Sequence, residues 1–315
     1  MTEIATDTLI QTQKRDNTMN HTQTSMPRKV KNIVTAHRQS EGGGFIVRRP
    51  IPSQDLDLLD PFLLLDEMGP VNYAPGKAIG APDHPHRGFE TVTYLLEGEM
   101  QHKDSVGHQG VLKPGDVQWM TAGSGVVHSE MPSPKMLDKG GPMHGFQIWV
   151  NLPSRLKMTK PRYQEVAQNQ IPMATSADGL AQVKVIAGKA LGVEAIIDTH
   201  TPIVYHDWTI QPGGQVSTEI SPDHHVGVYV FSGTIVVGTD GQEVEDGQLA
   251  ILTEGSTIQL SVSPKEHTAA RFLILGGIPH NEPVARYGPF VMNTKEELQQ
   301  AFADYQVGRM GQINA

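Results

Sequence analysis

The sequence predicts an all-β protein made of two similar antiparallel barrels, with a helix near the C-terminus. Short runs rich in β-branched and aromatic residues recur along the chain, and turns separate them without intervening helical patterns. Gly and Pro, with 32 and 22 residues out of 315, are as abundant as many tight turns require. The second half of the chain repeats features of the first half. These observations indicate a duplicated antiparallel sandwich or jelly roll.

The composition excludes several classes of protein. Hydrophobic residues make up 38% and charged residues 19% of the chain, as in a globular protein. The net charge of −9 argues against a general affinity for nucleic-acid phosphates. Because there are no cysteines, disulfides, thiolate nucleophiles and Cys-ligated metal centres are excluded. No apolar segment has the length of a membrane span or the features of a secretion signal, so we expect a cytoplasmic protein.

The chain is expected to divide into three parts. Residues 1–28 are polar and rich in Thr, Gln and Asn, and we expect a disordered extension in which Met19 or Met26 is an alternative start to Met1. Residues 29–160 are expected to form the first barrel, and residues 161–315 the second barrel with the terminal helix. Residues 153–177, which include Pro161 and Pro172, read as a connector between the barrels.

The first half reads as a regular series of strands and turns. Two short strands flank the glycines at 42–44, and an apolar run at 60–67 reads as a buried strand. Residues 69–82, with three prolines and three glycines, are expected to form a loop that leads to His84. Further strands are expected at residues 92–96, 100–105, 117–120, 126–128 and 145–152.

The second half repeats this pattern and ends in a helix. Residues 229–233 (YVFSG) resemble residues 94–98 (YLLEG), and the turn at 246–249 resembles the turn at 114–117. In residues 294–297, Thr294 and Glu297 have the spacing of a capping box. Apolar residues then follow at helical spacing, which predicts a helix that packs one face on a barrel: Leu298, Ala301, Phe302 and Tyr305.

Two pairs of polar residues indicate a metal site. His84 and His86 are two residues apart, as are His128 and Glu130, and 42 residues separate His86 from His128. Side chains at i and i+2 of a strand point to the same face. Imidazoles and a carboxylate that meet at one point suit divalent iron, nickel, copper, manganese or zinc. Glu90 is also an even number of residues from both His84 and His86, so a continuous strand would point it inward as well.

Several segments resemble the pirin family, which belongs to the cupin superfamily. They are residues 83–92 (DHPHRGFETV), 114–123 (PGDVQWMTAG), 127–132 (VHSEMP), 146–153 (FQIWVNLP) and 288–294 (GPFVMNT). The resemblance extends from about Val30 to the terminal helix. It implies two tandem cupin domains, with a metal ion in the first domain only.

The resemblance also implies the ligand set. In pirins three histidines and one glutamate bind iron, and the matching positions are His84, His86, His128 and Glu130. The general cupin pattern takes its glutamate near Glu90, so Glu90 is kept as an outer or alternative ligand. We expect one divalent ion, foremost Fe(II), with Ni, Cu, Mn, Zn and Co as alternatives.

Three functions compete. Several pirins show quercetinase activity, which opens a flavonol with O2, and here Glu130 would be both a ligand and the catalytic base. Other pirins are non-catalytic partners of transcription factors or metabolic enzymes, which implies a metal- or redox-sensing regulatory protein. An enzyme acting on another small substrate is the third hypothesis.

The second half lacks the metal-site residues. Alignment of the two halves puts Glu219 and Ser221 at the positions of His84 and His86, and Leu260 at the position of His128. The second barrel is therefore expected to be structural or to bind a partner. A monomer is expected, because two barrels in one chain can cover each other's apolar faces.

Overall fold

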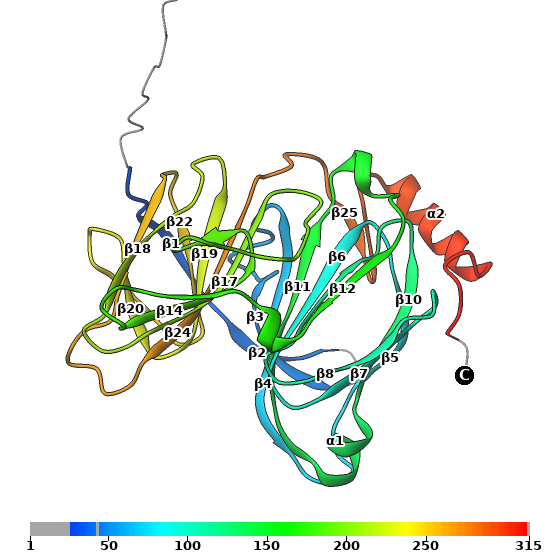
Figure 1. The fold of residues 1–315 in the computed structure, drawn as a ribbon. Helices are drawn as coiled ribbons and strands as arrows, with labels where there is room; N and C mark the ends of the chain where they lie inside the picture. Colours follow the sequence, from blue (N-terminus) through cyan, green and yellow to red (C-terminus); the bar gives the residue numbers. More distant parts are fainter. Residues whose placement is uncertain (1–25, 42–43, 314–315) are drawn as a thin grey trace, which may run out of the picture.

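Two antiparallel barrels lie side by side in the structure, a computed structural model that describes residues 26–41 and 44–313 (Figure 1). Each barrel consists of one seven-stranded and one four-stranded sheet. No helix in these described ranges is both long and apolar enough to cross a membrane.

The first barrel contains the predicted histidines. Its larger sheet has the order β12 (Arg162–Val166), β9 (Val117–Thr121), β6 (Phe89–Glu97), β11 (Gly141–Asn151), β4 (Phe62–Tyr73), β3 (Phe45–Ile51) and β2 (His37–Glu41). Its smaller sheet has the order β5 (Ala81–His86), β10 (Val126–Pro132), β7 (Met100–Asp104) and β8 (Gln109–Leu112). The short helices in this part of the chain are α1 (Pro134–Lys139), η1 (Ser154–Leu156) and η2 (Gln168–Gln170).

The second barrel repeats this arrangement. Its larger sheet has the order β1 (Val30–Thr35), β22 (Gln248–Leu252), β19 (His225–Ser232), β24 (Ala270–Gly277), β17 (Ile203–Ile210), β14 (Ala181–Ala187) and β13 (Met173–Thr175). Its smaller sheet has the order β18 (Gln215–Glu219), β23 (Thr257–Ser261), β20 (Thr234–Val237) and β21 (Gln242–Glu245). Two short ribbons pair β15 (Lys189–Ala190) with β16 (Val193–Glu194), and β25 (Ala285–Tyr287) with β26 (Phe290–Met292).

The two larger sheets pack against each other between the barrels. Their facing side chains form one continuous buried cluster, which includes Tyr94, Trp119 and Phe146 from the first barrel and Tyr205, Tyr229 and Leu273 from the second. The second barrel also has a closed apolar core of its own, around Trp208 and Phe272. Burial of this apolar surface is the main force that joins the barrels.

The ends of the chain cross over between the barrels. The first strand, β1, pairs with β22 of the second barrel, from Val30 opposite Leu252 to Thr35 opposite Gln248. The last helix, α2 (Lys295–Gln306), lies on the outer side of the first barrel, far from β1 (Figure 1). Strand β12, beyond residue 160, pairs with β9 of the first barrel. Each of these three segments therefore belongs to the barrel opposite to the one that the predicted division between residues 160 and 161 assigned to it.

Both ends of the described chain are well anchored. Residues 1–25 of the expected N-terminal extension lie outside the described residues, but Arg28 is buried and donates hydrogen bonds to the carbonyls of Ser221 and Thr253. At helix α2 the predicted capping box is present, with Thr294 Oγ1 accepting from the Glu297 amide at 3.1 Å and Glu297 accepting in return.

Candidate metal centre

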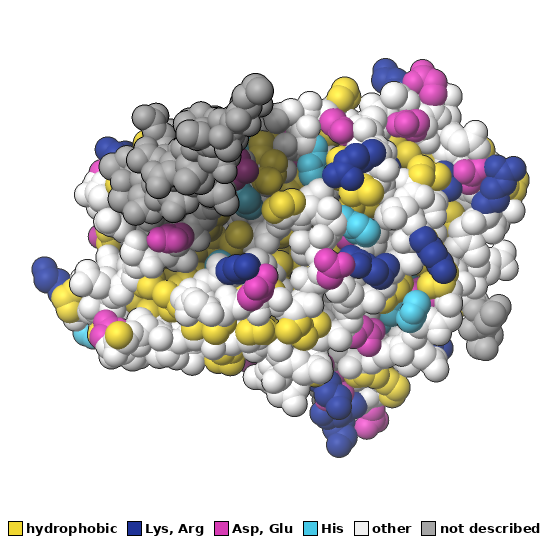
Figure 2. All heavy atoms as spheres, turned by 45° about the horizontal axis from the view of Figure 1, so that its top comes forward, with side chains coloured by type: hydrophobic (Ala, Val, Ile, Leu, Met, Phe, Trp, Pro, Cys, Tyr) yellow, Lys and Arg dark blue, Asp and Glu magenta, His cyan; other side chains and the backbone are white. Residues whose placement is uncertain are grey.

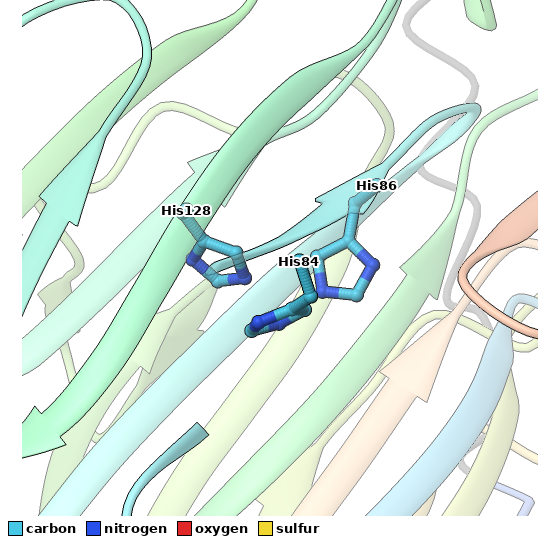
Figure 3. Close-up of side chains that lie close together, drawn as sticks. All are labelled: His84, His86 and His128. Atoms are coloured by element: carbon cyan, nitrogen blue, oxygen red, sulfur yellow. The ribbon is translucent and has the colours of Figure 1, made fainter. Parts of the chain in front are cut away.

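Strands β5 and β10 bring three histidines together. They pair antiparallel with His128 opposite His84, and His86 follows two residues later on the same face of β5. One ligating atom from each ring lies within 4.8 Å of the other two. The ring centroids are 4.3 Å apart for His84 and His128, and 4.9 Å apart for His86 and His128. Figure 3 shows the three rings gathered around one point.

Backbone carbonyls fix the orientation of two of these rings. His84 Nδ1 lies 2.7 Å from the carbonyl of Pro82, and His86 Nδ1 lies 3.3 Å from the carbonyl of Pro289. A carbonyl oxygen only accepts, so Nδ1 carries the hydrogen in both rings. The lone pair is then on Nε2, the atom left to bind a metal ion.

The third ring, that of His128, also indicates a metal site, because it lacks hydrogen-bond partners among the described residues. His128 is fully buried, and neither of its ring nitrogens has a hydrogen-bond partner among the described residues. Buried polar groups are almost always paired, so an orphaned imidazole beside two others indicates a missing ligand. A metal ion would provide that partner, and the three nitrogens therefore fit one.

Burial keeps the imidazoles of His86 and His128 neutral, which is the form that binds metal. It is the largest cause that lowers the pKa of His86, to about 3, and the neighbouring His84 adds to the effect. Burial likewise lowers the pKa of His128 well below its usual value, with His86 and His84 as further causes. Neutral imidazole nitrogens are the commonest metal ligands in proteins.

Glu130 lies in the same cavity, two residues beyond His128 on β10. Its Oε1 accepts a hydrogen bond of 2.8 Å from the hydroxyl of Thr93 on β6. Burial raises the pKa of Glu130, while the nearby His84 and the Thr93 hydrogen bond act in the opposite direction. The group whose ligating atoms all lie within 4.8 Å of one another contains the three histidines without Glu130.

Glu90 does not share this site. Its Oε1 accepts a 2.6 Å hydrogen bond from Thr121, and the charges that act on its pKa are those of Arg162, which lowers it, and Asp198, which raises it. It does not line the cavity that holds the histidines. The expectation that Glu90 points inward fails because the strand is not continuous: β5 ends at His86, Gly88 turns with φ +89°, and β6 belongs to the other sheet.

The three-histidine group opens into a cavity of about 810 Å³. Its inner wall contains His84, His86 and Glu130, with Gln147 and Trp149 of β11 beside them. The ribbon β25–β26, from the far end of the chain, and the turn within it contribute a further part of the lining: Arg286, Tyr287, Gly288, Pro289 and Val291. Apolar side chains line much of the rest: Phe45, Val47, Leu63, Leu64, Met68 and Met100. A largely apolar cavity with a few convergent polar groups is typical of a small-molecule site.

The sequence did not single out several of these residues. Trp149 and Gln147 alternate along β11 and both reach the cavity, but period-two alternation alone does not tell which face of a strand borders a ligand. Pro289 is 203 residues from His86, and no local pattern connects them. Trp119 and Phe146, two aromatic residues of the same large sheet, lie in the cluster between the barrels.

Comparison with known proteins identifies the family. A sequence model of the Pirin family matches residues 44–150, and a model of the Pirin C-terminal cupin domain matches residues 205–311. The Pirin of Homo sapiens is 45% identical over 287 residues, which cover 90% of this chain and 94% of that protein. The chain belongs to the pirin family. The predicted fold, two tandem cupin domains with a C-terminal helix, is confirmed.

Other pirin relatives are similarly close. A pirin-like protein of Solanum lycopersicum is 44% identical, over 91% of this chain and 94% of that protein. Among solved structures, a quercetin 2,3-dioxygenase from Acinetobacter baumannii superposes with a TM-score of 0.84 at 39% identity, and covers 91% of this chain and 100% of that one. The pirin fold and the three-histidine group are thus present together in this chain.

Proposed function

We propose that this pirin is a metal-dependent dioxygenase that opens flavonols such as quercetin with O2. The observation that carries the proposal is the group of three histidines, two of which, His84 and His86, line a cavity large enough for a small aromatic molecule. The similarity to the quercetin 2,3-dioxygenase of Acinetobacter baumannii supports the substrate class.

The proposed ligands of the metal ion are His84, His86, His128 and Glu130. Fe(II) is the ion we favour, and Ni, Cu, Mn, Zn and Co have similar demands for imidazole and carboxylate. When bound, such an ion supplies the Lewis acidity that makes an enolic hydroxyl acidic and the redox capacity that dioxygen chemistry requires.

The protein's own groups then bind the substrate and accept its proton. Trp149 and the neighbouring leucines offer an apolar wall for an aromatic ring. Thr93 engages Oε1 of Glu130, which leaves Oε2 to accept the proton of the flavonol hydroxyl. In this assignment Glu130 is the catalytic base as well as a ligand.

Oxygen uptake with quercetin tests the proposal. The protein is analysed for metal, reconstituted with Fe(II) and assayed beside a His84→Ala/His128→Ala double variant. The matched control is His225→Ala, which removes an exposed histidine of the second barrel. We expect turnover in the wild type and the control, and its loss in the double variant.

The same assay distinguishes the proposed dioxygenase from the main alternative function. A chain that holds one metal ion but consumes no oxygen with several flavonols is instead a metal- or redox-sensing regulatory protein, and a search for its protein partner should follow. Direct binding of nucleic acid is not expected, because the net charge is −9 and basic and acidic side chains are interspersed over the face in Figure 2. The cytoplasmic location and the monomeric state stay predictions.

A further inference from the structure

The turn after the second histidine is held by the far end of the chain. This turn comprises His86, Arg87 and Gly88, and it connects β5 to β6 across the two sheets of the first barrel. The C-terminal segment, residues 285–310, includes the ribbon β25–β26 and helix α2. Three separate contacts join the two.

The first contact is with the imidazole itself. His86 Nδ1 donates to the carbonyl of Pro289 at 3.3 Å. This carbonyl fixes the tautomer of His86 and aims Nε2 at the other two rings. The ring is also enclosed by Phe89 and Trp149, whose centroids lie 5.2 and 5.3 Å away.

The second contact is a buried ion pair. Arg87 Nη1 donates to Asp304 Oδ2 at 2.8 Å, and the two side chains are only 5% and 11% exposed. Arg87 Nε also donates to the carbonyl of Ser124 at 2.7 Å. The main chain of Arg87 is held as well, since its carbonyl accepts from the Val291 amide at 3.1 Å. Removing one member of a buried pair leaves the other charge uncompensated, so this contact specifies one position of the turn.

The third contact is made by a buried lysine. Lys157 Nζ donates to the carbonyls of Gly88 and Val291 at 2.8 and 3.0 Å, and to Asn151 Oδ1 at 2.7 Å. The ammonium group thus uses all three of its hydrogens on neutral oxygens, and it links the turn to β26. Lys157 is 2% exposed. A buried ammonium with only neutral acceptors is costly, which indicates a role in holding these segments together.

We propose that the C-terminal segment sets the metal affinity of the first barrel by holding His86 in its ligating orientation, with Asp304 and Lys157 as positioning residues. The inference rests on the metal site of the proposed function, but not on the dioxygenase activity. It assigns a metal-site role to Asp304, which lies 217 positions after Arg87 in the sequence, and to Lys157, which contacts Gly88.

Co(II) binding to the full-length protein tests this inference. The probe is Co(II) alone, because its visible absorption reports the ligand geometry, and a competing chelator gives the dissociation constant. Asp304→Asn and Lys157→Met are each expected to raise the dissociation constant about 10- to 100-fold, the usual range for loss of an outer partner of a metal ligand. Their Co(II) spectra are also expected to differ from that of the wild type.

The control is Asp198→Asn, which breaks the exposed Arg162–Asp198 ion pair away from the turn. It is expected to leave both the affinity and the spectrum unchanged. If Asp304→Asn and Lys157→Met lower the unfolding temperature of the metal-free protein but keep wild-type affinity and spectrum, the segment is merely structural and the inference is overturned. A wild type that binds no Co(II) overturns the proposed metal site as well, so the two failures are distinguishable.

A second measurement needs no variant. Nitrogen NMR of the wild type with labelled histidine reports the tautomer of His86 directly. We expect the hydrogen on Nδ1, protected from exchange by the Pro289 carbonyl. A hydrogen on Nε2 in the metal-free protein would contradict the proposed orientation.

Discussion

The hydroxyl of Tyr94, on β6 of the first barrel, donates a hydrogen bond of 2.7 Å to Asp207 on β17 of the second barrel. The reverse contact is also present, because Tyr229 on β19 donates to Glu67 on β4 at 2.6 Å. Strands β6 and β19 occupy equivalent places in the two larger sheets, as do β4 and β17. The duplication therefore extends to the polar contacts that join the barrels.

Loss of either tyrosine hydroxyl should destabilise the protein. Tyr94→Phe removes a donor from Asp207, and Tyr229→Phe removes one from Glu67, both of which are buried. We expect a cost of about 1–3 kcal/mol for each in the free energy of unfolding, measured by denaturant titration. The two contacts share no partner, so the double variant should show the sum of the single effects. If the double variant loses clearly less stability than this sum, the two contacts are coupled through the interface.

Glu90 should make stability fall as the pH rises. Burial is the largest cause that raises its pKa from 4.5 to about 7, so the folded state holds its proton more tightly than the unfolded state. Stability is then fully present below about pH 4.5 and is lost as the pH rises through 7. Full ionisation of Glu90 lowers the free energy of unfolding by about 3 kcal/mol, compared with a residue that does not titrate.

Glu90→Gln removes this titration and provides the measurement. The variant should unfold at a higher denaturant concentration than the wild type at pH 8, and the difference should vanish near pH 4. Its metal content should equal that of the wild type, because Glu90 lies away from the three histidines. Metal loss in this variant would restore Glu90 as a ligand.

Glycine is required at position 88 for a reason beyond its backbone angle. A Cβ there would lie 1.9 Å from the Val291 carbonyl oxygen, at φ +89°. Gly107 has a similar φ of +96° but open space around it, and is the matched control. Gly107→Ala should cost about 1–2 kcal/mol from backbone strain alone, whereas Gly88→Ala should cost roughly 4 kcal/mol or more. Equal unfolding free energies for the two variants would show that β26 moves aside at little cost.

Glu130→Gln separates the two roles proposed for this side chain. An amide still accepts the hydrogen bond from Thr93 but does not take up a proton at neutral pH. We expect quercetin turnover to fall about 100-fold or more, the usual contribution of a general base, with a smaller fall in bound Fe(II). Parallel measurement of metal content and oxygen uptake checks this. If both decline in proportion, Glu130 serves as a ligand and not as the base.

The sequence predicted the histidines because their geometry is local. His84 and His86 lie on one uninterrupted strand, so their two-residue spacing carries over directly into space. The same rule failed for Glu90, because Gly88 interrupts the strand and β6 joins another sheet. Residues an even number of positions apart point to the same face only within one strand. The residue pattern around Gly88 did not show where β5 would end.

The partners of each sheet edge were not predictable either. β1 and β12 occupy corresponding edge places, one in each barrel. Apolar periodicity identifies a strand but not the sheet that receives it. The part of the cavity wall that comes from β25–β26 was unpredictable for a similar reason. Its contact with His86 spans 203 residues of sequence, and no local pattern predicts such a contact.

The crossing of the chain ends also bears on the order of events in the cell. Pro289 is synthesised 203 residues after His86, a delay of roughly 10–40 s at the usual rate of about 5–20 residues per second. Once His128 has been made, 42 residues after His86, the nascent first barrel has its three histidines but still lacks the carbonyl, carboxylate and amide groups that hold the turn after β5. Tight uptake of the ion is thus expected to follow translation of the last hairpin and helix, so that a truncated nascent chain would compete poorly for scarce cellular metal.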